Sequence, residues 1–583
     1  MKKIISLVAA SVCVSFGAEN LTSIEFSEVS VPKTDSEKRE VRASSSVKVN
    51  DKEHKIGYNI IMRSGDKVGD GVFGALYDTN GKLITTKDGS PRISNDNDFS
   101  SLLTYGDKIF MISHFETRPA AMYVTELRQD KNGKLTAVNT RNIDFSKFGG
   151  LWVPCAGSVT PWGTHLGSEE YEPDARTIKD NGDGGEYYNL MGEYFSGDLT
   201  KLNPYAYGWT PEIKIVSDKS DVEVTKHYSM GRFAHELSYV MPDNKTVFLS
   251  DDGTNVGLFM FVSDKAGDLS AGTLYAAKWN QIDDKNGGTA NLEWMDLCHA
   301  SNNEIKKAIK DNVKFSDMFE VAEFKDESCP AGFTPTKANA DSNQETPPEC
   351  IKLKDGMEKV ASRLETRRVA AIKGATTEFR KMEGITYNNN LNEVYIGMSE
   401  INKGMESFKN KGKDSNKYDV KGFDHIRLPH NTCGTVYRLS LVEDEKIGSK
   451  FVPSVMKGMI SGKYSSTGDK LNTCDLNGLA NPDNVTYINN TGTLIIGEDT
   501  GDGHQNDAIW SYNIAEDKLT RIFTTPYGSE TTSPYYYNNI AGFGYIMAVV
   551  QHPYGESDED KLSNPSDSRA YTGYIGPFPV ITK

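Results

Sequence analysis

The segment CAGSVTPWGTHLGSEE, residues 155–170, joins one cysteine to two adjacent carboxylates through a stretch rich in Gly, Pro and Thr. Residues of these types hold a loop in a defined conformation and are poor core formers. A thiolate among carboxylates is a ligand set suited to iron or another transition metal. Cys155, Glu169 and Glu170 are therefore candidate metal ligands. The competing interpretation is that Cys155 is an ordinary buried thiol.

Further acidic groups fall at the ends of apolar runs along the chain. They are Glu236 in GRFAHE, Asp251 and Asp252 in FLSDDG, Glu383 beside Lys381 in EFRKMEG, Asp483 in NPDN, and Glu498 and Asp499 in IIGEDTGDG. His552 in VVQHP also ends an apolar run. Each motif alone is explained as an ordinary turn or a solvated strand end. Carboxylates that converge would repel one another unless cations held them, and calcium binds several carboxylate and carbonyl oxygens. The joint pattern therefore indicates a metal centre.

Composition and missing motifs exclude several classes of protein. The net charge of −16 and the pI of about 5.3 argue against a nucleic-acid-binding protein. The sequence lacks a G-x-S-x-G nucleophile turn, a Walker A loop and an HExxH pair. A serine hydrolase, a P-loop enzyme and a zinc protease are therefore disfavoured.

The elements that must position these residues are short strands. From residue 56 onward, apolar runs alternate with polar turns such as Asn80-Gly81, and the pattern recurs near residues 131, 240, 388 and 486. Repeated antiparallel hairpins predict an all-β fold, either a β-propeller or a large β-sandwich. In a propeller, equivalent strand ends meet at the central channel. Helix formers at 302–313 and 355–378 predict a helical insertion at about 300–380. Within 363–379 we expect an amphipathic helix that stops near Gly374, and 404–420 reads as a polar loop.

The N-terminus reads as a secretory signal peptide, residues 1–18, with Lys2 and Lys3 before a short apolar run. Residues 19–55 form a polar lead-in. No other segment reads as a membrane span, so we expect a periplasmic or secreted protein, by the general secretory route because a twin-arginine pair is lacking. Export permits disulfides. Cys329–Cys350 is the best candidate pair and Cys433–Cys474 a weaker one, which would leave Cys155 and Cys298 free.

In their order along the chain these motifs resemble those of the PhoX-type bacterial alkaline phosphatases. The resemblance rests on CAGSVTPWGTHLGSEE, GRFAHE, FLSDDGTNVGLFMFV, RLETRRVAAIKGATTEF, KMEG, NPDN and VVQHP, with MISHFE at 111–116 a looser match. It spans about residues 56–580 and places the catalytic domain at 56–583. It implies a six-bladed β-propeller with added helices and a central-channel site. It also implies two Fe³⁺ and three Ca²⁺ ions around a bridging oxide, and the hydrolysis of phosphate monoesters.

Carried over residue by residue, the resemblance makes Cys155 an iron ligand. It makes Glu170, with its neighbour Glu169, and Glu236, Glu383 and Asp483 the carboxylate ligands. Lys381 takes the place of an arginine that contacts substrate phosphate, because KMEG replaces the family's Arg-Pro-Glu-Gly. A lysine neutralises phosphate as a point charge and cannot form the bidentate contact of arginine. Asp251, Asp252, Glu498, Asp499 and His552 are second-rank candidates, and His114 and Glu116 carry little weight. His165 replaces a common Trp and Ser168 a common Cys.

The chemistry expected from this site is metal-assisted attack on a phosphoryl group, with Lys381 offsetting charge on its oxygens. Two other functions remain open: a calcium-dependent propeller esterase or lactonase, and a non-catalytic binding module stapled by calcium. For the phosphatase we expect small-molecule phosphomonoesters as partners. We expect no nucleic acid, no stable membrane association and a monomer.

Overall fold

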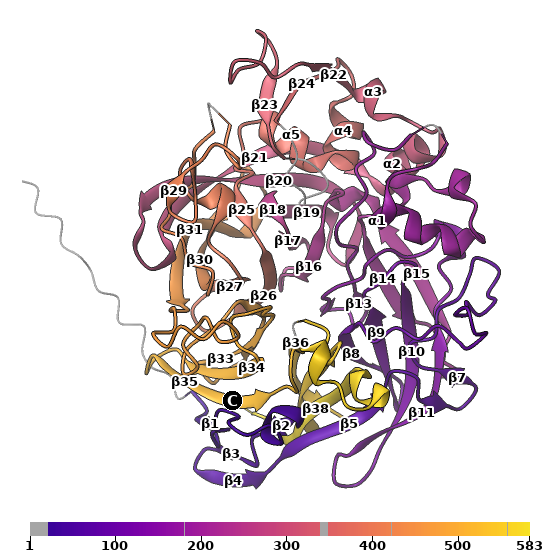
Figure 1. The fold of residues 1–583 in the computed structure, drawn as a ribbon, viewed down its shortest axis with the longest axis vertical. Coiled ribbons are helices and arrows are strands. Elements are labelled where there is room, and N and C mark those ends of the chain that lie inside the picture. Colours follow the sequence, from indigo (N-terminus) through magenta and orange to yellow (C-terminus); the bar gives the residue numbers. More distant parts are fainter. Residues whose placement is uncertain (1–20, 180, 339–347, 421–422, 557, 583) are drawn as a thin grey trace, which may run out of the picture.

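The computed structural model describes residues 21–179, 181–338, 348–420, 423–556 and 558–582. Antiparallel sheets dominate these residues and surround a common centre (Figure 1). The prediction of an all-β fold is confirmed. The predicted signal peptide, residues 1–18, lies outside the described residues.

Within the described ranges the main sheets divide into six meanders of four strands. The first is β8 (Asn97–Tyr105), β9 (Lys108–Phe115), β10 (Ala121–Gln129) and β11 (Leu135–Asn142). The second is β12 (Ser158–Val159), β13 (His165–Leu166), β14 (Thr210–Ile215) and β15 (Val222–His227). The third is β16 (His235–Val240), β17 (Thr246–Asp251), β19 (Phe259–Lys265) and β20 (Asp268–Asp283).

The remaining meanders come from the second half of the chain. The fourth is β26 (Met382–Asn388), β27 (Glu393–Met398), β30 (Thr435–Asp444) and β31 (Ser449–Ser461). The fifth is β32 (Pro482–Ile488), β33 (Thr493–Glu498), β34 (Ala508–Asn513) and β35 (Lys518–Thr524). The sixth is β36 (Glu530–Ile540), β37 (Phe543–Gln551), β38 (Tyr571–Pro579) and the early strand β5 (Gly57–Arg63). Strand β21 (Thr289–Ser301) pairs with both β20 and β31, so the third and fourth meanders form one nine-stranded sheet.

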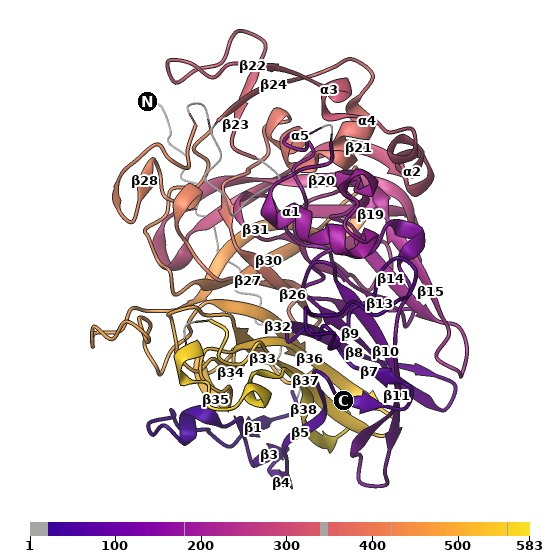
Figure 2. The same ribbon diagram turned by 45° about the vertical axis from the view of Figure 1, so that its right-hand side comes forward.

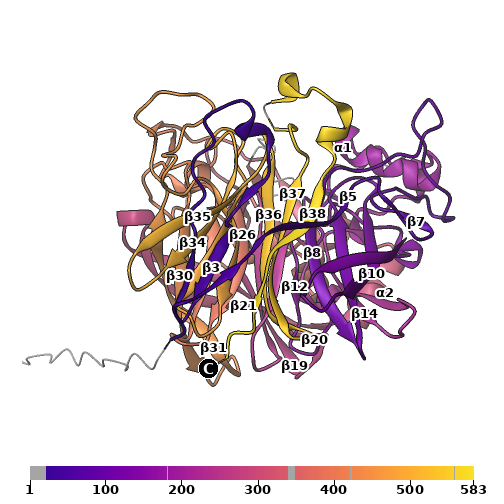
Figure 3. The same ribbon diagram turned by 90° about the horizontal axis from the view of Figure 1, so that it is seen from below.

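The first strand of each meander lies nearest the centre, and these strands form a closed ring. Strand β8 contacts β12, β12 contacts β16, β16 contacts β26, β26 contacts β32, β32 contacts β36, and β36 contacts β8. The outer pairing of β5 with β38 joins the beginning of the fold to its end (Figure 3). This is the closed arrangement that a six-bladed propeller requires, and it leaves no free edge between the first and last meanders.

The apolar core lies between neighbouring sheets. One cluster, for example, joins Tyr395 and Val436 of the fourth meander to Val485 and Leu494 of the fifth. The alternating side chains of each strand place one set on either face, so both faces of a sheet are covered by its neighbours. The central space is then left to the residues at the strand ends.

Helices lie at one edge of the ring, with a small sheet beside them (Figure 2). They are α1 (Glu186–Asn189), α2 (Asn302–Lys310), α3 (Phe315–Met318), α4 (Glu358–Leu364) and α5 (Thr366–Ile372), and the sheet is β22 (Phe319–Ala322), β24 (Glu349–Leu353) and β23 (Thr334–Thr336). The helix predicted in 363–379 is divided at Glu365, whose φ of −133° and ψ of 54° are not helical. Its arginines are also buried, because acceptors surround them: Arg363 donates to backbone carbonyl oxygens, whereas Arg367 pairs with the carboxylates of Glu172 and Asp251.

The remaining elements are short. The lead-in contains β1 (Ile24–Phe26), β3 (Ser46–Val49) and β4 (Lys52–Lys55) in one sheet, and β2 (Arg42–Ala43) paired with β35. Three further hairpin-like pairs are β6 (Lys67–Val68) with β7 (Gly71–Val72), β18 (Thr254–Val256) with β25 (Phe379–Arg380), and β28 (Lys409–Asn410) with β29 (Lys413–Asp414). Both predicted disulfides, Cys329–Cys350 and Cys433–Cys474, are present. Cys155 and Cys298 are free, as expected.

Candidate metal centre

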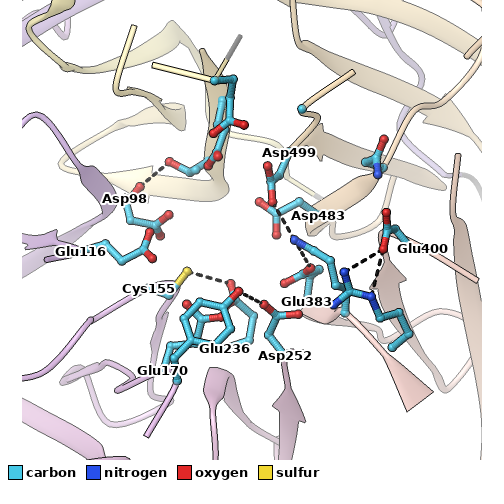
Figure 4. A pocket seen from close by; sticks show the side chains of 18 residues that line it. Asp98, Glu116, Cys155, Glu170, Glu236, Asp252, Glu383, Glu400, Asp483 and Asp499 are labelled. Atoms are coloured by element: carbon cyan, nitrogen blue, oxygen red, sulfur yellow. Dashed lines mark hydrogen bonds and ion pairs between the residues drawn. The ribbon is translucent and has the colours of Figure 1, made fainter. Parts of the chain in front are cut away.

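A polar cavity of about 330 Å³ lies at the centre of the ring. Figure 4 shows carboxylates converging on it from several sheets. Its lining comprises Asp98, Glu116, Cys155, Glu170, Tyr171, Glu236, Asp252, Arg380, Lys381, Glu383, Glu400, Asn481, Asp483, Asp499, Gly501, Glu530, Thr532 and Glu556. Of the five carboxylate ligands that the resemblance implies, four line the cavity, and Glu169 does not.

The inner strands deliver their acidic groups from equivalent positions. Asp98, Glu236, Glu383 and Asp483 are each the second residue of their strand, and Glu530 is the first residue of β36. In each of the five hairpins, the pairing register shifts within the first few residues of the inner strand. Such an irregularity bends a strand and re-aims its side chains, and it is common beside functional sites. The sixth inner strand, β12, is preceded by Cys155.

The ends of the second strands supply another set of acidic groups. Glu116, Asp252 and Asp499 each follow directly after β9, β17 and β33. Because Asn97 pairs with Phe115, His235 with Asp251, and Pro482 with Glu498, each of these groups lies beside an acid of the first set. The hairpin geometry therefore brings carboxylates together in pairs.

Cys155 lies among these carboxylates. Its sulfur donates to Glu236 Oε1 over 3.3 Å. Ligand atoms of Cys155, Asp98 and Glu116 lie within 4.8 Å of one another, and so do those of Cys155, Glu170 and Glu236. Two further groups meet the same limit: Glu236 with Glu383 and Asp483, and Glu530 with His552 and Glu556.

Burial and mutual repulsion raise the pKa values of several groups in the cavity, because both effects disfavour the ionised forms. Burial, with the neighbouring charge of Asp499, raises the pKa of Asp483 to about 7. Burial and then Glu383 raise the pKa of Glu236 well above its usual range. Burial, followed by the charge of Asp98, likewise raises the pKa of the Cys155 thiol. A bound cation would favour the ionised forms of all three.

Two cationic side chains line one wall of the cavity. Lys381 Nζ lies 3.0 Å from Asp499 Oδ2 and 3.4 Å from Glu383 Oε1. Although burial lowers the pKa of Lys381, these carboxylates outweigh it and hold the lysine charged. Arg380 uses Nε and Nη2 on Glu400, at 2.9 and 2.8 Å, while its buried Nη1 has no hydrogen-bond partner.

Four predicted site residues do not line the cavity, and three of them, Glu169, Asp251 and Glu498, are held by other partners. Glu169 accepts from Lys226 at 2.7 Å and from the backbone N–H groups of Trp152 and Trp209. Asp251 is paired with Arg367. Glu498 accepts from Trp510, His504 and two backbone N–H groups. Each is the neighbour of a cavity carboxylate in sequence. Asp251 and Glu498 are the last residues of β17 and β33, where successive side chains point in opposite directions.

His552 lies beside the cavity rather than in its lining. Its Nε2 is 3.0 Å from Glu530 Oε1 and 3.5 Å from Glu556 Oε1, and both glutamates line the cavity. Six titratable residues of the lining are not among the predicted site residues: Asp98, Tyr171, Arg380, Glu400, Glu530 and Glu556. Glu116, which also lines the cavity, carried little weight in the prediction. Asp98 and Glu116 were open to detection, because they occupy the same hairpin positions as Asp483 and Asp499.

The fold and the site together define a class of protein: an all-β ring of sheets that encloses a candidate metal centre made of buried carboxylates and one thiol. Residues 125–553 match the family described as alkaline phosphatase PhoX. The chain therefore belongs to the PhoX alkaline phosphatase family and is a phosphatase.

One solved structure agrees with this fold. The chain resembles Pseudomonas fluorescens PhoX in complex with vanadate, a transition state analogue, with a TM-score of 0.59 and 17% sequence identity over 95% of this chain and 98% of that one. A putative 6-phosphogluconolactonase from Bacteroides uniformis has 11% identity over 79% of this chain and 94% of that one, and its TM-score of 0.28 is too low to indicate a shared fold. No curated protein matches the chain by sequence.

Proposed function

We propose that the protein hydrolyses small-molecule phosphate monoesters with a mixed iron and calcium cluster in the central cavity. The observation that carries the proposal is the position of Cys155. Its sulfur belongs to two groups of possible ligands at once, one with Asp98 and Glu116 and one with Glu170 and Glu236. A site built for calcium alone would not need a thiolate, because calcium takes oxygen ligands.

The donor set fits the group that the family resemblance implies. Cys155 supplies the soft donor that iron accepts, and the surrounding carboxylates supply oxygen donors for iron and calcium. Glu170, Glu236, Glu383 and Asp483 would hold the cluster together with Asp98 and Glu116. When bound, two Fe³⁺ and three Ca²⁺ ions with a bridging oxide would supply Lewis-acid polarisation of the phosphoryl oxygens.

Lys381 and Arg380 are proposed to bind the substrate phosphate. Lys381 already faces Asp499 and Glu383, whereas the free Nη1 of Arg380 is available to an incoming anion. Arg380 could thus restore part of the contact that the family's arginine makes. The two side chains would neutralise negative charge on the phosphoryl oxygens as it moves toward the leaving group.

The first test is elemental analysis of the purified protein for iron and calcium, with turnover of p-nitrophenyl phosphate measured on the same samples. Cys155→Ser should lose iron and lower kcat at least 100-fold. Cys298→Ser is the matched control, because Cys298 is the other free cysteine and does not line the cavity. Retention of iron and activity by Cys155→Ser would refute the role of the thiolate.

A second test separates the two cations. Arg380→Lys should raise KM for the phosphomonoester about tenfold with little change in kcat, if Arg380 acts in ground-state binding. Lys381→Arg should raise kcat/KM if the lysine is a weaker substitute for arginine. An unchanged KM in Arg380→Lys would remove Arg380 from the substrate site.

Export and a monomeric state complete the proposal. Among the described residues, no helix combines the length and apolar character that crossing a membrane would demand. Export by means of the predicted signal peptide, residues 1–18, would place metal loading after translocation, and the two disulfides suit an oxidising compartment. We propose a periplasmic or secreted monomer that binds neither nucleic acid nor a membrane.

A further inference from the structure

A hydrogen-bonded pair of histidines, His114 and His165, lies behind the segment that carries Cys155. His114 is in β9, two residues before Glu116, and His165 is the first residue of β13, five residues before Glu170. Both side chains are completely buried, and neither lines the central cavity. The proposed chemistry therefore gives neither histidine a direct contact with substrate.

Three hydrogen bonds connect this histidine pair to the backbone of Cys155 on one side and to β8 on the other. His114 Nδ1 lies 2.6 Å from the carbonyl oxygen of Cys155. His114 Nε2 lies 2.6 Å from His165 Nε2, and His165 Nδ1 lies 2.8 Å from Ser101 Oγ. Each of the four ring nitrogens thus takes part in one hydrogen bond.

The direction of these hydrogen bonds follows from the chemistry of the partners. A carbonyl oxygen can only accept, so His114 Nδ1 carries a proton. Burial lowers the pKa of His114 to about 4 and the pKa of His165 well below its usual range, so both rings are neutral. A neutral ring that donates at Nδ1 accepts at Nε2, so His165 Nε2 donates to His114, and Ser101 donates to His165 Nδ1. All three hydrogen bonds therefore run in one direction and end at Cys155.

The packing around the pair holds both rings in these orientations. The ring of Phe99 lies against both, with centroid distances of 5.6 Å to His114 and 5.7 Å to His165. The two imidazole planes are nearly perpendicular, at 89°. Gly167 leaves room for the contact, because a Cβ atom at this position would lie 3.0 Å from His114 Nε2. The rings have little freedom to turn away from their hydrogen-bond partners.

The segment around Cys155 needs such support, because residues 153–157 belong to no helix or strand. Val153 has a φ of 36°, a left-handed conformation that is strained for a β-branched residue and persists only where its surroundings hold it. Ser168 Oγ donates to the carbonyl oxygen of Ala156 over 2.7 Å. Side chains, His114 and Ser168, therefore hold two successive carbonyl groups beside the thiol.

We propose that His114 and His165 are positioning residues that fix the backbone of Cys155, so that its sulfur stays between two groups of carboxylates. One group is Asp98 with Glu116, which follows β9, and the other is Glu170 with Glu236. The pair joins β9, the thiol segment and the segment that leads to Glu170. The proposal rests on the proposed function only in taking iron as the ion that the thiol receives.

The first experiment measures how fast iodoacetamide alkylates Cys155 in chelator-treated protein, by mass spectrometry of the peptide. Cys155 is partly exposed and lines the cavity, so a small neutral reagent reaches it. His114→Asn places an amide N–H where Nδ1 lies and keeps the bond to Cys155, whereas His114→Gln places it near the position of Nε2 and loses that bond. The glutamine variant should raise the rate about tenfold, because a released segment opens more often, and the asparagine variant should stay within about threefold of the wild type.

Two controls show whether the effect is specific. Cys298, the other free cysteine, is alkylated in the same samples and should react at an unchanged rate. Thr125→Val removes a buried hydrogen bond to Thr140 in the same meander without touching the thiol segment. Equal Cys155 rates in the asparagine and glutamine variants, or an equal acceleration in Thr125→Val, would overturn the proposal.

Variants of the second histidine decide the matter if those of His114 do not fold. His165→Leu removes the donor to His114 Nε2 and should also accelerate alkylation of Cys155. His165→Gln offers an amide N–H near the position of Nε2 and should restore a slow rate. Wild-type rates in both would show that His165 does not act on the thiol segment.

Iron content and turnover of p-nitrophenyl phosphate separate this proposal from the proposed function. His114→Gln should lower iron content and kcat, the latter about tenfold, with an unchanged KM because the substrate wall is intact, and His114→Asn should preserve both. Faster alkylation with unchanged iron and kcat would overturn the role of the pair for the metal centre. If Cys155→Ser retains iron, the proposed function fails, and the alkylation rates still decide whether the pair positions the thiol.

Discussion

The crowding of carboxylates in the central cavity predicts an unusual pH dependence once the metals are removed. Asp483 is 4% exposed, and its pKa rises from 3.8 to about 7, through burial and then Asp499. The folded protein therefore holds a proton that the unfolded chain releases. The stabilisation is complete below about pH 4 and is lost as the pH rises through about 7.

The size of the effect follows from the shift. About three pKa units at 1.36 kcal/mol each correspond to roughly 4 kcal/mol for one such group. Asp483 interacts with Asp499 and Lys381, so the loss belongs to the coupled set and is not summed over its members. Cations that replace the proton would abolish the trend, because they favour the ionised carboxylates.

The assay is urea unfolding of chelator-treated and metal-loaded protein at pH 5, 6 and 7. The midpoint of the metal-free protein should fall across this range, and that of the loaded protein should not. Asp483→Asn should flatten the metal-free trend, and exposed Asp414→Asn should leave it unchanged. A metal-free midpoint that stays level or rises with pH would refute the reasoning.

Other predictions concern groups outside the cavity. Glu169→Gln leaves the buried Lys226 ammonium unpaired, so we expect a loss of about 3–5 kcal/mol in unfolding free energy. Iron and calcium content should be unchanged; loss of metal would restore Glu169 as a ligand. Replacing both Cys329 and Cys350 by Ala frees a loop with a separation of 21 residues and should cost about 3 kcal/mol, measured by urea unfolding. Phosphomonoesterase activity should survive, and its loss would mean that the insertion supports the site. Arg367→Met leaves two buried carboxylates, those of Glu172 and Asp251, without their cationic partner. The free energy of unfolding should fall by about 3–5 kcal/mol, measured by urea unfolding, whereas an unchanged value would show that the two carboxylates tolerate the loss.

Several features followed from local sequence alone. Alternating apolar runs and turn residues predicted the hairpins, because these patterns express the two-residue period of a strand and the backbone demands of a turn. The pairing of Cys329 with Cys350 was open to prediction because one short loop separates them. The order of the motifs, from Cys155 to Asp483, sufficed to predict the family.

What only the tertiary structure decided was which member of each acidic pair reaches the centre. Glu169 and Glu170 are adjacent residues of the same type, and the sequence does not distinguish them. In the structure Glu169 is paired with Lys226, whereas Glu170 lines the cavity. Asp251 and Asp252 divide in the same way. For Asp251 and Asp252 the register of β17 decides the face to which each side chain points. For Glu169 and Glu170, which lie outside the strands, backbone hydrogen bonds with His235 and Val153 hold the chain in place.

The sequence by itself determined the all-β class, the chemical character of the site and the residues that anchor it. Closure of the ring, which sets β36 beside β8, decided that Glu530 and Asp98 share one cavity although 432 positions separate them (530 − 98). It also decided that Asp419 lies near Glu378 rather than in solvent, as a polar loop would suggest. Such contacts depend on how separate sheets pack, and no local pattern of residues encodes that distance.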